Sequence, residues 1–412
     1  MPVIKAFKAL KPSQTLLTRV VTRPLDDYST GQAKLILSEN EHNFLHLISP
    51  ELDHLYLRGS RTELVYKKIT ENLEQFIDNG TLIFEEKPAI YIYQVEHNGI
   101  KQTGIWTLTD IEEYFKGNIK KHENTVERRE KALAEYIQQS NLDANPVLIT
   151  YPKNQVINNL INNYLLKSPD IDFTFNDLSI HKIWVVTDNA DVALFIKTFA
   201  DIDQVYIADG HHRAASMAKM CRQKRIINGE SKTADYNYFS TVYMDTEEVK
   251  ILPFYRLVRD LADLTEKEFI HQITKHFSIE KLRNYSQPQQ LHEMNMYLPS
   301  GWYKLKVKPE FIINDPVNSL DVSILQELIL APILKINDPR TDARLTFEGG
   351  RADIEHLIKQ VDNGIQAVLF SLPPITAQQV IDVADAGLVM PPKSTFIEPK
   401  FLVGLLTNYF RH

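Results

Sequence analysis

Apolar and polar positions follow two different spacings along the chain, and each spacing predicts a different element. In residues 61–78 the apolar positions recur every three or four residues, which is the spacing of one face of a helix. They are Leu64, Tyr66, Ile69, Leu73 and Ile77. In residues 89–95 and 101–106 apolar and polar positions alternate, with Asn98-Gly99 between them. Asn-Gly between two alternating segments predicts a β-hairpin.

The middle of the chain alternates between buried-strand and helix patterns. Short apolar runs predict strands at 146–151, 183–187, 204–208 and 236–245, and helical spacing predicts helices at 154–165, 190–200 and 265–278. Near the C-terminus the same criteria predict strands at 302–308 and 366–371 and helices at 319–330 and 376–385. Strands that alternate with helices indicate an α/β fold of mixed α+β character.

The order of these elements suggests a chain of two or three parts. We expect an N-terminal α+β region at 1–145, a central α/β region at 146–310 and a C-terminal α/β region at 311–412 that completes a site. A length of 412 residues is compatible with two or three domains.

Composition and charge narrow the classes of partner. The net charge of −7 disfavours general nucleic-acid binding, which depends on neutralising phosphates. No signal-peptide pattern and no apolar run long enough for a membrane span are present, and Cys221 is the only cysteine. We therefore expect a soluble cytoplasmic protein without a membrane partner. The oligomeric state stays open, with a homodimer among the options.

The segment Asp209-Gly210-His211-His212-Arg213 is the strongest candidate for chemistry. It joins the predicted strand ending at Ala208 to a helical run. A tight strand–helix turn directs backbone N–H groups and the positive end of a helix at an anion. Histidine and arginine donate to phosphate oxygens, and an aspartate can act as a base or hold a metal ion. The structural alternatives are that Asp209 only caps the helix and that Arg213 only pairs with it.

A second candidate lies at 120–125, just before a predicted helix. Glu123 could serve as a general base and His122 as a hydrogen-bond donor. Asn124 and Glu127 have the spacing of a capping box, so a capped, solvated helix start is the alternative.

A third candidate is the loop 390–395, in which two prolines precede Lys393, Ser394 and Thr395. A lysine with two hydroxyls is suited to phosphate, although no Walker A pattern surrounds it. A rigid turn is the alternative. The paired acids Asp26 and Asp27 could bind Mg²⁺, but a solvated turn explains them better.

Together these segments resemble the bacterial family called domain of unknown function 1015. The likeness extends over essentially the full length, through residues 7–12, 43–46, 117–125, 208–213, 320–325 and 390–395. This chain departs from the family at Arg23-Pro24-Leu25-Asp26-Asp27, where a Pro-Pro-Tyr-Asp-Val loop is usual. The Asp-Gly-His-His-Arg segment also resembles the signature of free serine kinases in the ParB and sulfiredoxin superfamily, in which the turn binds nucleotide phosphates.

The resemblance implies a nucleotide-dependent phosphotransferase that acts on a small hydroxyl metabolite, with serine or phosphoserine the leading candidate. Gly210, His211, His212 and Arg213 would bind phosphates together with Lys393, Ser394 and Thr395. Glu123 or Asp209 would take the hydroxyl proton, with His122 beside them. Mg²⁺ with ATP or ADP is expected, with Asp209 as metal ligand or orienting group. The alternatives are a phosphomonoesterase such as a phosphoserine phosphatase and a non-catalytic, nucleotide-switched binding protein.

Overall fold

The computed structural model of the protein describes residues 2–54, 57, 63–229, 231 and 233–410. The chain folds into two compact units, and each is assembled from segments that are distant in sequence. Unit 1 contains Met1–Lys120, Asn124–Val249 and Pro399–His412, and unit 2 contains Lys121–Glu123 and Lys250–Glu398.

Unit 1 is built on a mixed sheet that has nine strands within the described residues. In order across the sheet they are β6 (Ile119–Lys120), β11 (Val205–Asp209), β8 (Val147–Tyr151), β12 (Tyr238–Asp245), β5 (Ile100–Asp110), β4 (Ile90–His97), β10 (Ile180–Val186) and β9 (Ile171–Thr174), and β1 (Ile4–Lys5) pairs with β5. The pairs β6–β11 and β8–β12 are parallel and the other pairs are antiparallel.

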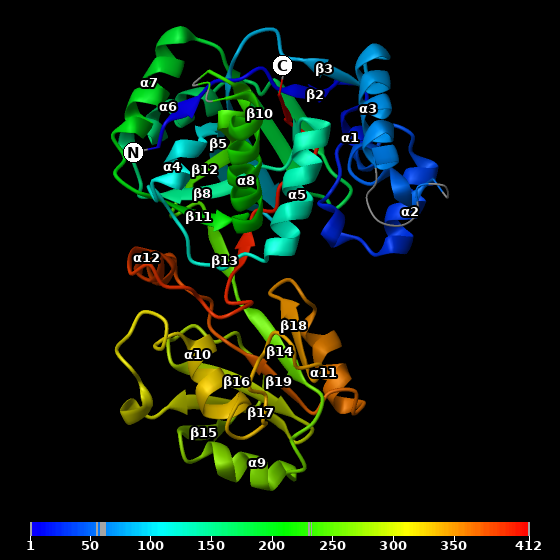
Figure 1. Ribbon diagram of the computed structural model, residues 1–412. Coiled ribbons are helices and arrows are strands. Elements are labelled where there is room, and N and C mark those ends of the chain that lie inside the picture. Colours follow the sequence, from blue (N-terminus) through cyan, green and yellow to red (C-terminus); the bar gives the residue numbers. More distant parts are fainter. Residues whose placement is uncertain (1, 55–56, 58–62, 230, 232, 411–412) are drawn as a thin grey trace. The chain divides into compact units, whose positions relative to one another are not determined.

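The helices of unit 1 include those that the apolar spacing predicted at 61–78, 154–165 and 190–200. They are α1 (Leu17–Val20), α2 (Thr30–Glu39), α3 (Glu63–Asp78), α4 (Ile111–Phe115), α5 (Glu127–Ser140), α6 (Gln155–Leu165), α7 (Asn189–Ala200) and α8 (His211–Asn228), with 3-10 turns η1 (Leu25–Asp27), η2 (Phe44–Leu47), η3 (Pro50–Leu52) and η5 (Asp235–Asn237). Helices α5 and α8 lie side by side (Figure 1). Two short ribbons complete the unit: β2 (Leu10–Pro12) with β3 (Leu82–Phe84), and β7 (Leu142–Asp143) with β21 (Asn408–Tyr409).

Unit 2 has its own antiparallel sheet, with six strands within the described residues. The order is β15 (Phe277–Lys281), β17 (Gly301–Val307), β16 (Glu293–Leu298), β19 (Val368–Ser371), β14 (Phe254–Val258) and β18 (Leu345–Gly349). A separate ribbon pairs β13 (Lys250–Leu252) with β20 (Phe396–Glu398). The helical elements are α9 (Glu266–Ile273), η6 (Pro309–Phe311), α10 (Asp321–Leu325), the π-helix η7 (Gln326–Leu330), α11 (Ile354–Asp362) and α12 (Ala377–Asp385).

Most predicted elements are confirmed, including the mixed α/β class and the hairpin. Asn98 and Gly99 both have positive φ between β4 and β5, as a tight hairpin turn requires. The predicted capping box is wrong. The helix α5 begins at Glu127, so Val126 stands at its N-cap and makes no capping hydrogen bond through its side chain.

The sequence analysis placed domain boundaries at residues 145 and 310, but the boundaries of the two compact units lie elsewhere. Strand β12 pairs with both β5 and β8, so the chain before and after residue 145 shares one sheet. Strands β17 and β19 belong to the same sheet on either side of residue 310. Pairing between strands that are distant in sequence sets these boundaries, and local patterns do not reveal it.

Each unit encloses an apolar core of its own. In unit 1 residues such as Ile149 and Ile207 have no exposed surface, and in unit 2 the same holds for Met296 and Phe370. Burying one such side chain stabilises a fold by roughly 1.5–3 kcal/mol. Within the described residues, the helices are too short or too polar for any of them to cross a membrane.

Candidate functional site

The strand that leads into the predicted turn is irregular at its last residues. Residues 205–208 are buried in the sheet, where β11 pairs with β8. Tyr206 and Ile207 pair in register, but the register shifts between Ile207 and Asp209. A β-bulge of this kind bends the strand and redirects the side chain that follows. The local structure therefore sets Asp209 apart from the regular sheet.

Gly210 makes the change from strand to helix and has a left-handed backbone. Its φ is +100°, which residues with a Cβ rarely adopt. A Cβ built at this position would lie 2.8 Å from Nε of Arg213. A residue with a side chain at this position would therefore strain the backbone and displace the guanidinium that packs over it.

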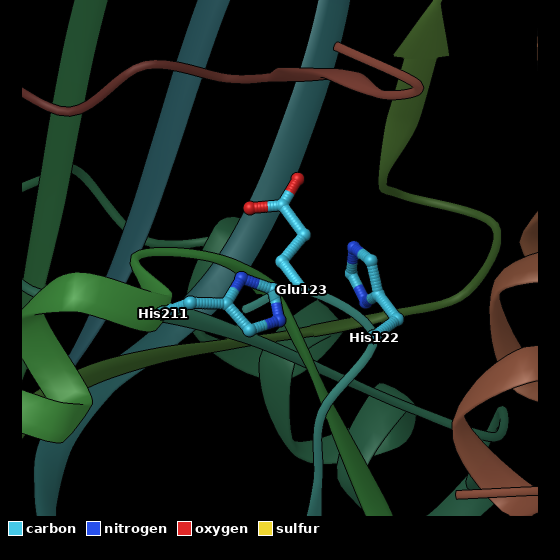
Figure 2. A group of neighbouring side chains, drawn as sticks. All are labelled: His122, Glu123 and His211. Carbon is cyan, nitrogen blue, oxygen red and sulfur yellow. The ribbon is translucent and has the colours of Figure 1, made fainter. Parts of the chain in front are cut away.

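Helix α8 begins at His211 (Figure 2), and the residue at its N-cap, Gly210, has no side chain that could cap it. A backbone hydrogen bond runs from the N–H of Ala214 to the carbonyl of Gly210 at 3.0 Å, and the N–H groups of the first turn of a helix point out of its N-terminal end. The alternative that Asp209 caps this helix is wrong, because the residue at the N-cap is Gly210. This arrangement of donors favours a bound anion.

Asp209 is held between two cations. Its Oδ2 accepts a hydrogen bond from Arg213, and its Oδ1 accepts one from Nζ of Lys400 at 2.9 Å. Burial alone would raise the pKa of Asp209, but Lys400 and Arg213 outweigh burial and lower this pKa to about 2. The ion pair between Asp209 and Arg213, which the sequence analysis gave as the structural alternative, is present, and Lys400 adds a second cation. One carboxylate therefore stands against two positive charges.

The Arg213 guanidinium is engaged on both of its terminal nitrogens. Besides Asp209, it donates through NH1 to Oδ1 of Asn145 at 2.6 Å and to the carbonyl of Pro146. These contacts join the start of α8 to the chain just before β8. These bonds use three of the five N–H donors of the guanidinium, and Mg²⁺ at Asp209 would meet two cations that already bind both carboxylate oxygens.

The two histidines of the turn differ in environment. His211 is buried and contributes to the lowered pKa of Asp209. His212 is half-buried, and burial followed by the nearby Arg129 lowers its pKa, while Glu130 opposes them. The Nδ1 of His212 is buried and has no hydrogen-bond partner among the residues that the structure describes. His212 is therefore a mostly neutral imidazole with an unused nitrogen at neutral pH.

The other predicted site residues belong to unit 2. His122 and Glu123 follow β6 on one short segment (Figure 2), and the carbonyl of His122 accepts a hydrogen bond from the backbone of Met390 at 2.9 Å. Lys393 is exposed, whereas Ser394 is buried and donates to the carbonyl of Pro391 at 2.6 Å. Unit 2 thus brings the segment of His122 against the loop that carries Lys393, Ser394 and Thr395.

Sequence reasoning missed three residues that shape these sites. Lys400 and Asn145 contact the turn in unit 1, and Arg256 contacts the loop in unit 2. Pro399 ends strand β20, and Lys400 follows it directly. The position just after this proline was the only local signal that could have drawn attention to Lys400. Asp27, assigned to a solvated turn, is exposed on η1 and interacts electrostatically with Lys400 and Asp209.

Comparison with known proteins places the chain by family. The family model described as "Protein of unknown function (DUF1015)" matches residues 4–323. Curated proteins give no match. Similar solved structures include a variant of a free serine kinase in complex with AMP, at 13% identity over 73% of this chain and 92% of that chain, with a TM-score of 0.37. SbnI with a C-terminal truncation, from Staphylococcus aureus, has 11% identity over 71% and 82% and a TM-score of 0.36. TM-scores this low do not establish a shared fold.

Proposed function

The chain belongs to the DUF1015 family of proteins of unknown function, and we propose that this member is a nucleotide-dependent phosphotransferase that acts on a small hydroxyl metabolite. Serine is the leading acceptor. ATP or ADP, with Mg²⁺, is the proposed phosphate donor. We also propose that the turn at residues 209–213 is similar to the phosphate-binding turn of the ParB and sulfiredoxin superfamily.

The observation that carries the proposal is the charge at the start of α8. An uncapped helix N-terminus, two cations and one carboxylate meet at Gly210. Phosphoryl transfer depends mainly on positioning and on neutralising charge. The backbone N–H groups of residues 210–213 and the imidazoles of His211 and His212 would bind the phosphates. The Arg213 guanidinium would hold the turn in shape.

Strand pairing and chain connectivity support a composite site. β6 and β11 are parallel neighbours, with Ile119 opposite Val205 and Lys120 opposite Tyr206. Parallel strands end at the same edge of a sheet, so the segments that follow them leave from that edge. One segment leads to His122 and Glu123, and the other is the turn at Gly210. We propose that Lys393, Ser394 and Thr395 join them, because the backbone of Met390 binds that of His122.

We assign the acid–base role to Glu123. The acceptor hydroxyl would attack the terminal phosphorus of the nucleotide while its proton passes to the Glu123 carboxylate. The bond from phosphorus to the bridging oxygen breaks, and the shortened nucleotide leaves. Asp209 is the better orienting group, because both its oxygens already accept from cations. His122 would orient the acceptor.

Purified full-length protein with Mg²⁺, ATP or ADP and a panel of hydroxyl metabolites tests the activity, with mass spectrometry of the phosphorylated products. A phosphorylated product that requires nucleotide supports the proposal. Phosphate release from phosphoserine without nucleotide would point to the phosphomonoesterase. Nucleotide binding without any turnover would point to the nucleotide-switched binding protein.

Two variants test the roles of the carboxylates. Glu123→Gln should lower turnover by roughly 10²–10⁴-fold while nucleotide still binds, because a general base contributes about that factor. Asp209→Asn should weaken nucleotide binding instead. Glu127→Gln is the control, since Glu127 is exposed and pairs only with Lys131, at 2.7 Å, within the part of the chain that the structure describes. Normal turnover by Glu123→Gln would move the base elsewhere, with Asp209 next in line.

A further inference from the structure

Arg256 on β14 carries a positive charge in the interior of unit 2. Its side chain is buried, and among the residues that the structure describes no carboxylate pairs with it. Burial lowers the pKa of this guanidinium, which nevertheless stays protonated at neutral pH. A buried ion without a counter-ion is strongly unfavourable. The guanidinium must therefore form hydrogen bonds that an apolar residue of similar size could not form.

Both hydrogen bonds of the Arg256 side chain go to backbone carbonyls, and its guanidinium also lies 5.4 Å from the centroid of the Phe347 ring. NH1 donates to the carbonyl of Phe254, and NH2 donates to the carbonyl of Lys393, each at 3.0 Å. The second contact spans 137 positions of sequence and is the one that fixes the loop 390–395. Lys393 has a φ of +56°, a left-handed conformation that residues with a side chain rarely adopt. The guanidinium therefore stabilises the backbone at the point where it is strained.

The side chain of Lys393 is also held by β14. Its Nζ lies 5.5 Å from the centroid of the Phe254 ring, within the range of a cation–π interaction. The Phe254 ring packs against Phe396 at 5.6 Å. A Cβ on Gly349 would lie 2.6 Å from the Phe396 ring, so the ring that supports Phe254 is itself closely packed. Two residues of one strand thus hold the carbonyl and the ammonium of the same lysine.

We propose that Arg256 is a positioning residue that presents Lys393 to the phosphates of the nucleotide. It acts through the backbone of Lys393 and does not itself touch the ligand. This inference rests on the proposed function, in which the loop 390–395 closes on those phosphates. An apolar residue at 256 would leave the loop free to change its conformation and would lose the fixed lysine.

A double-mutant cycle tests the coupling between the two residues. Nucleotide affinity is measured by calorimetry, with ADP and ATP as probes, for wild type, Arg256→Met, Lys393→Met and the double variant. We expect each single variant to bind about tenfold more weakly, which is typical of losing one charge-assisted contact. The double variant should bind no more weakly than Lys393→Met. Additive losses would show that Arg256 acts independently of Lys393 and would overturn the inference.

Thermal unfolding of the same variants separates positioning from simple loss of fold. If Arg256→Met does not fold, Arg256→Lys replaces it in the cycle, because it keeps the charge and loses the planar fork. Arg344→Met is the matched control, because Arg344 forms a guanidinium fork with Asp342 in the same unit. It should lower the Tm without changing affinity. A wild-type protein that binds neither nucleotide would refute the proposed function, whereas nucleotide binding with an additive cycle would refute only the role of Arg256.

Discussion

Asp209 in unit 1 and Asp321 in unit 2 are the same side chain in opposite electrostatic settings. Asp209 has Lys400 and Arg213 beside it, and after the opposing effect of burial its pKa falls to about 2. Asp321 is buried at the start of α10, and burial raises its pKa to about 7, opposed by a hydrogen bond from the backbone of His292 at 2.9 Å. The Nδ1 of His292 lies 3.8 Å from Oδ1 of Asp321, and burial lowers the pKa of this imidazole. Burial acts in the same direction on both aspartates, and the neighbouring cations decide the outcome.

Asp209 therefore belongs to a site that stabilises its charged form, whereas burial of Asp321 favours its neutral form. At neutral pH Asp209 is a fixed negative charge that organises two cations. Asp321 can take up a proton near neutral pH, so its charge depends on conditions. Strongly shifted pKa values occur at functional sites but also in purely structural networks. Only the partners of each group distinguish the two cases.

The largest effect should come from removing the ionisable group at 321. The folded-state pKa of about 7 lies above the ordinary value of 3.8. Between these values the unfolded chain loses the proton first, so the free energy of unfolding falls as pH rises from about 4 to about 7. Asp321→Asn should remove this fall and be more stable than wild type by of the order of 4 kcal/mol at pH 8. At pH 4 the two proteins should be nearly equal.

Denaturant unfolding of both proteins between pH 4 and pH 8 measures this difference. Asp342→Asn is a control in the same unit, because Asp342 forms a surface pair with Arg344. Parallel pH profiles for wild type and Asp321→Asn would mean that Asp321 is ionised in the folded protein, and the contrast with Asp209 would then disappear.

A smaller but substantial effect is expected at Arg213. Arg213→Met removes one of the two cations at Asp209 and the links to Asn145 and Pro146. Breaking a largely buried pair from one side costs roughly 3 kcal/mol. The free energy of unfolding in urea should fall by about that amount. Lys131→Met is the control, because Lys131 forms an exposed ion pair with Glu127. A variant that keeps wild-type stability but loses nucleotide binding would show that the guanidinium acts on the ligand directly.

The smallest change in stability is expected at Lys400. Its side chain is 36% exposed, against 18% for Arg213, so its pair with Asp209 is more accessible to water. Lys400→Met should cost at most about 1 kcal/mol of stability. It should nevertheless weaken nucleotide binding about tenfold, because a cation next to the phosphates is lost. Equal nucleotide affinity in wild type and variant would limit Lys400 to pairing with Asp209.

Local patterns predicted the elements well and the assembly only in part. The alternation around Asn98-Gly99 and the strand–glycine–helix order at Gly210 depend on nearest neighbours, and the structure confirms both. The missing cap of α5 was not foreseeable from spacing, because Asn124 and Glu127 had the required separation while the helix began at Glu127.

The contacts that set the electrostatics at each site come from far along the chain. Lys400 meets Asp209 across 191 positions, and Arg213 meets Asn145 across 68. An isolated lysine or asparagine carries no periodic signal that would pair it with such a partner. The turn was therefore predictable as a site, but the number of cations around its carboxylate was not.

The ribbon of β13 and β20 determines how unit 2 is connected to the rest of the chain. Lys250 and Glu398 are direct partners in it, so the long excursion of residues 250–398 starts and finishes at adjacent points. Because its two ends are adjacent, this segment joins the rest of the chain in the same way as the turn of a hairpin does, whatever the length of the segment. Loop-closure entropy grows only slowly with length. The length of this excursion therefore adds little closure entropy to the folding of unit 1.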